Sequence, residues 1–382
     1  MTRLAILTSH PIQYYAPLFR ELAERVDLHV FFAHKATSDQ QGQAGFGTSF
    51  DWDIDLTSGY EHSFLKNISK SPDATRFSGC DTPEIGQRLK DGRFDAVLSL
   101  GWHLKSLLQG VWAAKRQRRK VLIRGDSQLS TPRNPLKRLT KSISYPALLR
   151  VFDVALYVGT RNREYFRHYH FPKKRLVRSP HCVETSRFAV GATENARRSL
   201  RQELGVSPET PLLAFAGKQV EFKRPFDLID AIAELRNRGV AAEAMFIGSG
   251  PLEDSLRQRA KGRNIVCHFL GFQNQSEMPR AYAAADILVL PSTGRETWGL
   301  VCNEALACNT PLLVSDAVGC ATDLVGDQKV GRAFKLGDPI DCAKKALELI
   351  SNPPAADDMK AYTNAYSLSA AADGILAGIE LA

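Results

Sequence analysis

The stretch ILVLPSTGRETWGLVCNEALACNTPLLVSD, residues 287–316, decides the fold class of this chain. Residues 287–292 and 311–316 are short apolar runs of strand length, and a helix pattern begins near Gly299. A strand, a helix and a second strand in this order are typical of a parallel sheet with crossover helices. The stretch therefore predicts one repeating unit of such a sheet.

The same alternation of strand and helix patterns forms two series along the chain. Further strand patterns lie at residues 4–9, 28–32, 96–100, 120–125, 154–159, 175–180, 212–217, 244–248, 265–271 and 330–335. Residues 36–82, rich in Gly, Ser and Asp, interrupt the first series, and we expect an inserted loop or irregular region there, near the cleft. The boundary between the two series lies near 184–190. The sequence thus predicts an α/β protein with two parallel-sheet lobes.

Composition narrows the class of protein further. A length of 382 residues favours two domains, and 44% hydrophobic with 24% charged residues is ordinary for a globular protein. The longest apolar runs have strand length, so we expect no membrane-spanning helix. The N-terminus enters a strand pattern without signal-peptide features, which favours a cytoplasmic protein. Seven cysteines without a CxxC pair are expected to be reduced, mostly buried thiols.

The positive charge is concentrated in one region. Residues 111–178 hold eighteen Lys or Arg against three acidic residues. Within this region, residues 134–150 have a helix-start signal and a helix pattern with an apolar face flanked by basic residues. The apolar face holds Leu136, Leu139 and Ile143, and the basic residues beside it are Lys137, Arg138 and Lys141. Two interpretations stay open, a solvated surface helix and a contact with anionic lipid headgroups. No nucleic-acid signature accompanies the charge, so we expect no nucleic-acid partner.

Candidate site residues follow the predicted strands. Ligands of open parallel sheets bind at the carboxyl ends of the strands, where loops lead into helices. Five residues with polar side chains stand at such ends: His10, His103, Arg124, Asp126 and Lys218. We therefore expect these residues near a common crevice in each lobe.

The second lobe carries the stronger signals. Lys218 and Lys223 lie on a strand-to-helix loop, and two cations beside a helix N-terminus suit a diphosphate, although surface lysines give the same pattern. Gly248 ends the next strand, in a turn that is either beside the nucleotide or merely tight. Gly271 and Phe272 end another strand and suit backbone hydrogen bonds to a base edge.

Two glutamates flank the predicted helix start. Glu296 precedes Gly299 to Val301, and Glu304 follows about two helical turns after Glu296. Ionised carboxylates only accept hydrogen bonds, which suits sugar hydroxyls at one end of a ligand and a ribose at the other, with phosphate on the N–H groups between them. The competing interpretation is an ordinary loop glutamate and a helix-surface glutamate.

At these motifs the chain resembles the retaining nucleotide-sugar glycosyltransferases of family GT4. The resemblance covers most of the chain and is specific in the C-terminal half, in the order of its motifs. These are AGKQVEFKRPFDLIDAI (216–232), FIGSGP (246–251), FLGFQNQSEMPRAYAAADILVLPS (269–292) and GRETWGLVCNEALACNTPLLVSD (294–316). The resemblance implies the GT-B fold of two facing Rossmann-like domains. We expect an acceptor domain at 1–186, a donor domain at 187–365, and a helix at 366–382 that packs back on the first domain.

The resemblance also implies roles for individual residues. Lys218 and Lys223 would hold the donor diphosphate, Glu296 would bind sugar hydroxyls, and Glu304 would bind the ribose. The N–H groups of Trp298, Gly299, Leu300 and Val301 would support the phosphate and the sugar, and Gly248, Gly271 and Phe272 would border the donor.

The N-terminal half departs from the family pattern at two places. SHPIQYYAP (9–17) replaces a glycine-rich loop, and IRGDS (123–127) replaces a histidine that often follows a later strand. We expect His103 and Asp126 to substitute for that histidine, and we place His10 and Arg124 on the acceptor side.

The predicted function is transfer of a sugar from a UDP- or GDP-sugar to a hydroxyl acceptor with retention at the anomeric carbon. No metal and no cofactor are expected, because Lys218, Lys223 and the helix N-terminus would stabilise the diphosphate leaving group. The alternatives are a nucleotide-sugar 2-epimerase or hydrolase of the same fold, and a non-catalytic sugar-nucleotide binding protein. A Rossmann dehydrogenase is disfavoured, because no GxGxxG follows the first strand.

The acceptor is expected to be a sugar or a lipid-linked sugar in polysaccharide or glycolipid assembly. Residues 134–150 would then hold the protein peripherally on the inner face of an anionic membrane. The base, the sugar and the acceptor themselves depend on pocket shape and are not specified by these motifs.

Overall fold

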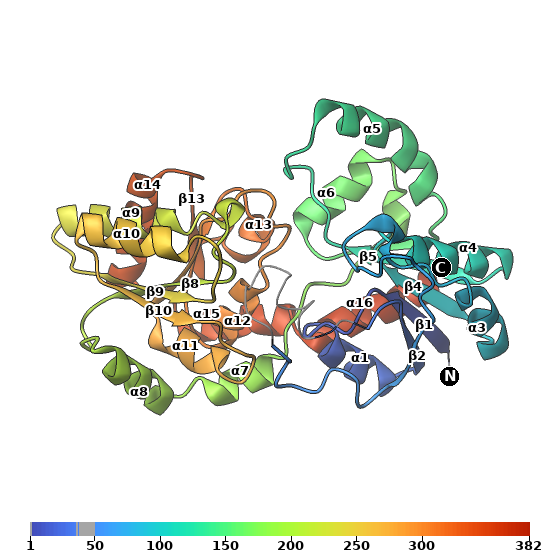
Figure 1. Ribbon diagram of the computed structural model, residues 1–382, viewed down its shortest axis with the longest axis horizontal. Coiled ribbons are helices and arrows are strands. Elements are labelled where there is room, and N and C mark those ends of the chain that lie inside the picture. Colours follow the sequence, from blue (N-terminus) through green and yellow to red (C-terminus); the bar gives the residue numbers. More distant parts are fainter. Residues whose placement is uncertain (1, 36, 38–49) are drawn as a thin grey trace.

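A computed structural model describes residues 2–35, 37 and 50–382 of the chain. The chain forms two lobes, which lie side by side in Figure 1, each built on a sheet with helices on both faces. The strands within both sheets pair in parallel. The α/β class with two parallel-sheet lobes, predicted from the strand and helix alternation, is confirmed.

The N-terminal lobe holds a seven-stranded sheet in the order β3-β2-β1-β4-β5-β6-β7. Its strands are β1 (Arg3–Thr8), β2 (Asp27–Phe32), β3 (Glu61–Phe64), β4 (Ala96–Leu100), β5 (Lys120–Gly125), β6 (Val154–Tyr157) and β7 (Leu176–Arg178). Its helices are α1 (Ala16–Ala23), α3 (Ile85–Gly92), α4 (Lys105–Arg116), α5 (Pro135–Leu149), α6 (Thr160–His168) and α16 (Leu368–Leu381), with the 3-10 turns η1 (Phe77–Gly79) and η2 (Lys173–Arg175). The strand order reverses between β1 and β4, which opens a crevice at the carboxyl ends of these strands.

The C-terminal lobe holds a six-stranded sheet in the order β10-β9-β8-β11-β12-β13. Its strands are β8 (Leu212–Ala216), β9 (Glu243–Ile247), β10 (Cys267–Gly271), β11 (Ile287–Leu290), β12 (Leu312–Ser315) and β13 (Gly331–Phe334). Its helices are α7 (Thr185–Gly191), α8 (Glu194–Leu204), α9 (Phe226–Asn237), α10 (Glu253–Arg263), α11 (Met278–Ala284), α12 (Val301–Ala307), α13 (Ala321–Leu324), α14 (Pro339–Ser351) and α15 (Ala356–Ala365), with the 3-10 turn η3 (Glu221–Lys223). Here the order reverses between β8 and β11, so the second crevice lies beside Lys218 and the 293–300 loop.

Strand β11 explains why the apolar runs predicted the sheets so well. All four of its residues are buried. Leu288 and Leu290 belong to the core on one face of the sheet, and Ile287 and Val289 belong to the core on the other. A parallel strand covered by helices on both faces needs a continuous apolar run rather than alternation.

Strand β3 corrects the expectation of an irregular region at residues 36–82. Its sequence, EHSF, contains a single large apolar residue and pairs only with β2, at the edge of the sheet. An edge strand with polar, half-exposed side chains lacks the apolar run by which buried strands are recognised. Residues 36 and 38–49 of that region lie outside the described residues.

Helix α16 packs on the N-terminal lobe, although the C-terminal lobe precedes it in the chain. Ala371, Ala372, Ile375 and Ile379 join the same buried core as strands β1, β2 and β4 to β6. Gly374 and Gly378 allow this close contact. A Cβ at Gly374 would lie 2.0 Å from the backbone oxygen of Arg178, so no larger residue fits without moving the helix.

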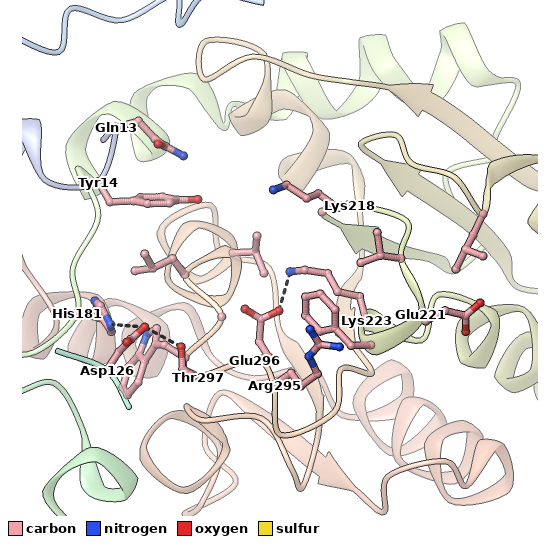
Figure 2. A pocket seen from close by; sticks show the side chains of 18 of the residues that line it. Gln13, Tyr14, Asp126, His181, Lys218, Glu221, Lys223, Arg295, Glu296 and Thr297 are labelled. Atoms are coloured by element: carbon pink, nitrogen blue, oxygen red, sulfur yellow. Dashed lines mark hydrogen bonds and ion pairs between the residues drawn. The ribbon is translucent and has the colours of Figure 1, made fainter. Parts of the chain in front are cut away.

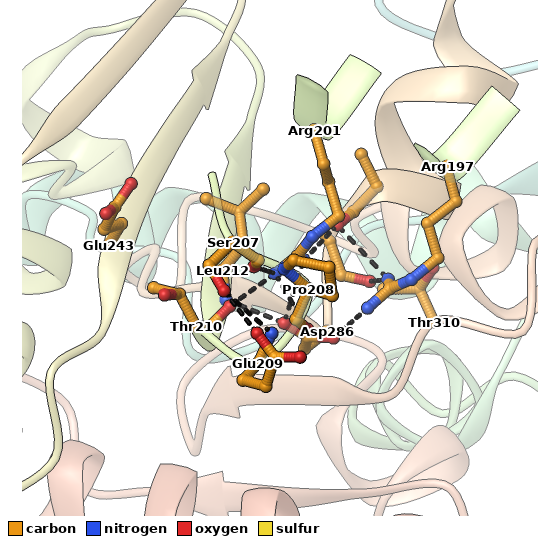
Figure 3. A network of polar contacts seen from close by, with 12 residues as sticks. Arg197, Arg201, Ser207, Pro208, Glu209, Thr210, Leu212, Glu243, Asp286 and Thr310 are labelled. Carbon is orange, nitrogen blue, oxygen red and sulfur yellow. Dashed lines mark hydrogen bonds and ion pairs between the residues drawn. The ribbon is translucent and has the colours of Figure 1, made fainter. Parts of the chain in front are cut away.

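A buried arginine anchors α8 at the amino ends of β8 and β11, the two central strands of the C-terminal sheet (Figure 3). Arg201 is 4% exposed and donates to the backbone oxygens of Ala284 (2.9 Å) and Ser207 (2.7 Å) and to the carboxylate of Asp286 (3.2 Å). Asp286 in turn accepts a hydrogen bond from the backbone N–H of Leu212, where β8 begins. Because the buried charges are paired and hydrogen-bonded, we interpret this network as structural.

All seven cysteines are free thiols; six are buried and Cys267 is partly buried. Over the described residues, no helix combines the length and the apolar character that crossing a membrane requires.

Candidate functional site

A cavity of about 850 Å³ lies between the two lobes at the carboxyl ends of their strands. The N-terminal lobe contributes Gln13, Tyr14, Trp52 and Asp126, and the linker into the second lobe contributes His181. The C-terminal lobe contributes the lysine loop after β8 and the 295–301 segment. Figure 2 shows Gln13 and Tyr14 on one side of this cavity and Lys218 and Lys223 on the other.

The lysine loop and the glutamate loop meet in this cavity. Lys223 Nζ lies 2.6 Å from Glu296 Oε2, and the two side chains are only 13% and 17% exposed. Burial lowers the pKa of Lys218, the nearby Lys223 lowers it further, and Glu296 opposes both. Two ammonium groups and one carboxylate thus share a partly desolvated site. The carboxylate supplies one negative charge against two positive charges, so the site favours an anionic ligand.

The backbone around Glu296 depends on a glycine. Gly299 has φ +97°, and a Cβ there would lie 2.5 Å from a Leu290 methyl group. The turn lets Leu300 cap α12, which begins at Val301. Gly299, Leu300 and Val301 all line the cavity beside Trp298, whose indole N–H donates to Asn303 Oδ1 at 2.8 Å. The structure therefore brings together Lys218, Lys223, Glu296 and the 298–301 segment.

Glu304 lies behind this segment and does not line the cavity. It is 1% exposed, and Tyr282 donates a hydrogen bond to its Oε2 at 2.6 Å. Burial raises the pKa of Glu304 to about 7, although the bond from Tyr282 favours the carboxylate. Contact between Glu304 and a ribose stays a prediction.

The raised pKa of Glu304 makes folding stability depend on pH. Between the ordinary value of 4.5 and about 7, the folded protein holds a proton that the unfolded chain has lost, so rising pH lowers the free energy of unfolding. The loss is complete above about pH 7 and amounts to about 3 kcal/mol at 1.36 kcal/mol per pKa unit. We expect Glu304→Gln, which removes this loss, to be more stable relative to wild type at pH 8 than at pH 5. Thermal unfolding at both pH values measures the difference. An equal difference at both pH values, as expected for the exposed control Glu24→Gln, would contradict the assigned cause.

The other donor-side candidates lie at the strand ends but not on the cavity. Gly248 and Gly271 have φ +117° and +68°, and the Gly248 N–H donates to the Gly271 carbonyl at 2.8 Å. A Cβ at Gly248 would lie 2.4 Å from the Gly217 carbonyl, so this turn requires glycine. Phe272 packs against Phe50 of the N-terminal lobe, with ring centroids 4.3 Å apart and the ring planes tilted by 34°.

Asp126 connects the N-terminal lobe to the glutamate loop. Its Oδ2 accepts a hydrogen bond from Thr297 Oγ1 at 2.6 Å and lies 4.0 Å from His181 Nε2 (Figure 2). Burial lowers the pKa of His181 well below its usual value, and Arg124 lowers it further. His181 is therefore a neutral imidazole at pH 7.

His181 is a cavity residue that the sequence interpretation missed. It follows β7 in SPHCVE, directly after the predicted strand at 175–180, but it is not among the candidate residues named from the sequence. The position after a strand was the signal that could have found it. Gln13 and Tyr14 lie in SHPIQYYAP, the loop after the first strand, so the same signal applied to them, whereas Trp52 carried no such signal.

Three N-terminal candidates do not line the cavity. Arg124 is 1% exposed and donates to Ser179 Oγ (3.1 Å) and the Pro180 carbonyl (2.7 Å), so it holds the linker. His10 bonds to Ser9 Oγ through Nδ1 at 2.9 Å, and burial lowers its pKa to about 4, with His34 and His103 acting in the same direction. Burial also lowers the pKa of His103, while Asp126 raises it.

Comparison with known proteins gives a family match for part of the chain and related folds for the whole of it. Residues 196–366 match the family model described as glycosyl transferases group 1. The GDP-mannose-dependent alpha-(1-6)-phosphatidylinositol monomannoside mannosyltransferase of Mycolicibacterium smegmatis is 28% identical over 238 residues, 60% of this chain and 59% of that protein. The D-inositol 3-phosphate glycosyltransferase of Actinosynnema mirum is 34% identical over 171 residues, 42% of this chain and 39% of that protein. The matched segments thus span less than two thirds of these relatives.

Solved structures extend the likeness to the whole chain. Anabaena Alr3699/HepE in complex with UDP superposes with a TM-score of 0.76 at 16% identity, covering 100% of both chains. WaaG, a glycosyltransferase involved in lipopolysaccharide biosynthesis, has a TM-score of 0.67 at 17% identity, covering 97% of this chain and 98% of that chain. At such identities the likeness shows the fold alone. Residues 196–366 therefore belong to the group 1 glycosyltransferases, in a chain that has the GT-B fold.

Proposed function

We propose that this protein is a retaining glycosyltransferase that moves a sugar from a UDP- or GDP-sugar to a hydroxyl group, with neither a metal nor a cofactor. The observation that carries the proposal is the pairing of Lys223 with Glu296 at 2.6 Å, beside Lys218, in a cavity lined by both lobes. Cations suit a diphosphate, and the carboxylate suits the hydroxyls of the sugar attached to it.

The ion pair has a physical role before the donor binds. A buried charge without a partner is costly, and in the empty site Lys223 and Glu296 compensate each other. When the donor binds, its diphosphate pairs with the ammonium group of Lys223. The carboxylate of Glu296, released from that pair, accepts hydrogen bonds from the hydroxyls of the sugar. Neither charge is left unpaired in either state.

The transfer step needs no protein nucleophile. The bond between the anomeric carbon and the diphosphate oxygen breaks, and Lys218 and Lys223 stabilise the negative charge that develops on the leaving group. The acceptor oxygen forms a bond to the same face of the anomeric carbon, and its proton passes to the leaving phosphate. Asp126 and His181 line the cavity, and we assign them to the side on which the acceptor would bind.

A donor and acceptor screen tests the proposal. UDP-, GDP- and ADP-sugars are compared by thermal shift, and products are then analysed by NMR with and without hydroxyl acceptors, in the presence and absence of EDTA. An α-linked product from an α-linked donor, unaffected by EDTA, supports the proposal. Free sugar or a 2-epimer that forms equally well without acceptor indicates the epimerase or hydrolase. Nucleotide binding with no turnover indicates a binding protein.

A lipid-linked acceptor in glycolipid or polysaccharide assembly is the second part of the proposal. The matching protein of M. smegmatis is named for action on a phosphatidylinositol mannoside. In this chain, helix α5 buries only Leu149, while its apolar side chains Leu136, Leu139 and Ile143 are 69%, 58% and 72% exposed. An apolar face among basic side chains suits the surface of an anionic membrane, peripherally and on its inner side.

Reversing the charge on α5 tests this membrane contact. We expect the triple variant Lys137→Glu, Arg138→Glu and Lys141→Glu to sediment with anionic vesicles at least about tenfold less than wild type, because each basic residue near the surface contributes about 1 kcal/mol. Wild-type binding should also fall as salt is raised.

The control reverses three exposed lysines of the C-terminal lobe, Lys335, Lys344 and Lys360. This variant should bind the vesicles like wild type. If the two triple variants bind equally weakly, net charge rather than α5 governs the contact. A wild-type protein that never binds at low salt leaves α5 as a solvated face and favours a soluble acceptor.

A further inference from the structure

The segment after β5 reaches across the cleft and holds the glutamate loop from the other lobe. Gln128 Nε2 donates to two backbone carbonyls of that loop, Gly294 O at 2.9 Å and Glu296 O at 3.0 Å. Gln128 is fully buried. The approach is close: a Cβ on Gly294 would lie 2.6 Å from the Ser130 carbonyl. These contacts join residues more than 160 positions apart in the sequence.

The Thr297 side chain of this loop also bonds across the cleft, to Asp126 Oδ2 at 2.6 Å, whereas three backbone–backbone bonds of the loop lie within the C-terminal lobe. The Glu296 N–H donates to Thr293 O at 2.9 Å, the Gly319 N–H donates to Glu296 O at 3.0 Å, and the Thr293 N–H donates to Phe222 O at 2.8 Å. These three bonds do not depend on the position of the N-terminal lobe. The two bonds from Gln128 exist only when the lobes are closed on each other.

We propose that Gln128 is a positioning residue that couples closure of the two lobes to the orientation of Glu296. The inference rests on the proposed function, in which Glu296 binds the sugar of the donor. One amide group fixes the carbonyls of Gly294 and Glu296, and therefore the peptide plane before Arg295 and the one after Glu296, which together bracket the residue that carries the Glu296 side chain. In the open state water replaces the amide, and the loop loses this constraint. Glu296 is then fully oriented only after the cleft has closed and excluded water.

A second contact between the lobes provides a matched control. Arg161 donates to the carbonyls of Ala317 (2.7 Å) and Asp316, so it too makes two hydrogen bonds from the N-terminal lobe to the backbone of the other lobe. Neither acceptor residue lines the cavity. If Gln128 merely helps to hold the lobes together, the loss of either side chain should have the same consequence.

The test compares Gln128→Met with Arg161→Met. We expect Gln128→Met to lower kcat by about 10²-fold, because a small misplacement of a group that orients the substrate has effects of that size. Its KM for the donor and its Kd for UDP or GDP should stay within about threefold of wild type, since the cations on the other loop are untouched. Arg161→Met should keep kcat within about threefold. Gln128→Asn keeps an amide that is too short to reach both carbonyls, and it should lose kcat as Gln128→Met does.

The outcomes separate this inference from the proposed function. Equal losses of kcat in Gln128→Met and Arg161→Met overturn the inference, as does wild-type kcat in Gln128→Met or in Gln128→Asn. A loss confined to nucleotide affinity overturns it as well. A wild-type protein that transfers sugar from no donor overturns the proposed function first and this inference with it. Thermal unfolding of each variant shows whether it is folded, and the two Gln128 substitutions keep the test decisive if one of them does not fold.

Discussion

Lys223→Met is expected to lower kcat for sugar transfer by about two orders of magnitude or more, the size of effect seen when one preorganised donor to a developing negative charge is removed. The variant keeps the length of the side chain but loses the ammonium group that lies 2.6 Å from Glu296. The leaving diphosphate then lacks one of its two cations, and Glu296 lacks its partner. Because the charge develops during the reaction, kcat should suffer more than KM for the donor.

Steady-state kinetics over a range of donor concentrations measures this effect. Lys261→Met on the exposed surface of α10 is the control and should behave like wild type. An unchanged kcat in Lys223→Met would remove the phosphate role assigned to this lysine. A KM raised alone would instead mean that the lysine binds donor and transition state equally.

Glu296→Gln is expected to have an effect of similar size on kcat while leaving the affinity for free UDP or GDP close to that of wild type. The amide offers one acceptor where the carboxylate offered two, and it no longer neutralises Lys223. Contacts to the sugar are affected, whereas the nucleotide is bound elsewhere. Calorimetric titration with free nucleotide, beside the kinetics of transfer, separates the two effects.

The comparison with Glu304→Gln tests the division of roles between the two glutamates. That variant should weaken binding of free nucleotide if Glu304 contacts the ribose. Glu24→Gln, an exposed change at the C-cap of α1, should alter neither property. If Glu296→Gln and Glu304→Gln weaken nucleotide binding to the same extent, the proposed division of roles is wrong.

The fold was predictable from the sequence wherever strands are buried on both faces. Runs such as ILVL at 287–290 are apolar throughout because both faces of β11 lie in a core. β3 escaped prediction because an edge strand needs no such run. Helix α5 was recognised because its cap and its amphipathic pattern are local, and Asn134 Oδ1 does accept a hydrogen bond from the Leu136 N–H at 2.8 Å.

The two sides of the candidate site also differ in how far the sequence predicted them. Lys218, Lys223 and Glu296 lie in loops with a recognisable order of motifs: the two lysines follow β8, and Glu296 follows β11. The N-terminal side is assembled from segments far apart in the sequence, among them Tyr14 and His181. Their convergence depends on how two lobes dock, which no local pattern encodes. Asp126 was predicted as a site residue because it follows a strand, whereas Gln128, two residues later, was not predicted.

Helix α16 also bears on how the protein is made. Residues 368–381 emerge from the ribosome after the entire C-terminal lobe, yet they pack on β5, β6 and β7 of the N-terminal sheet. Until then Leu122, Val154 and Leu156, against which Gly378 of α16 packs, lack this covering helix, although their own strands were synthesised long before. The later-made lobe can therefore fold to completion before the earlier one, the reverse of the usual N-terminal-first order.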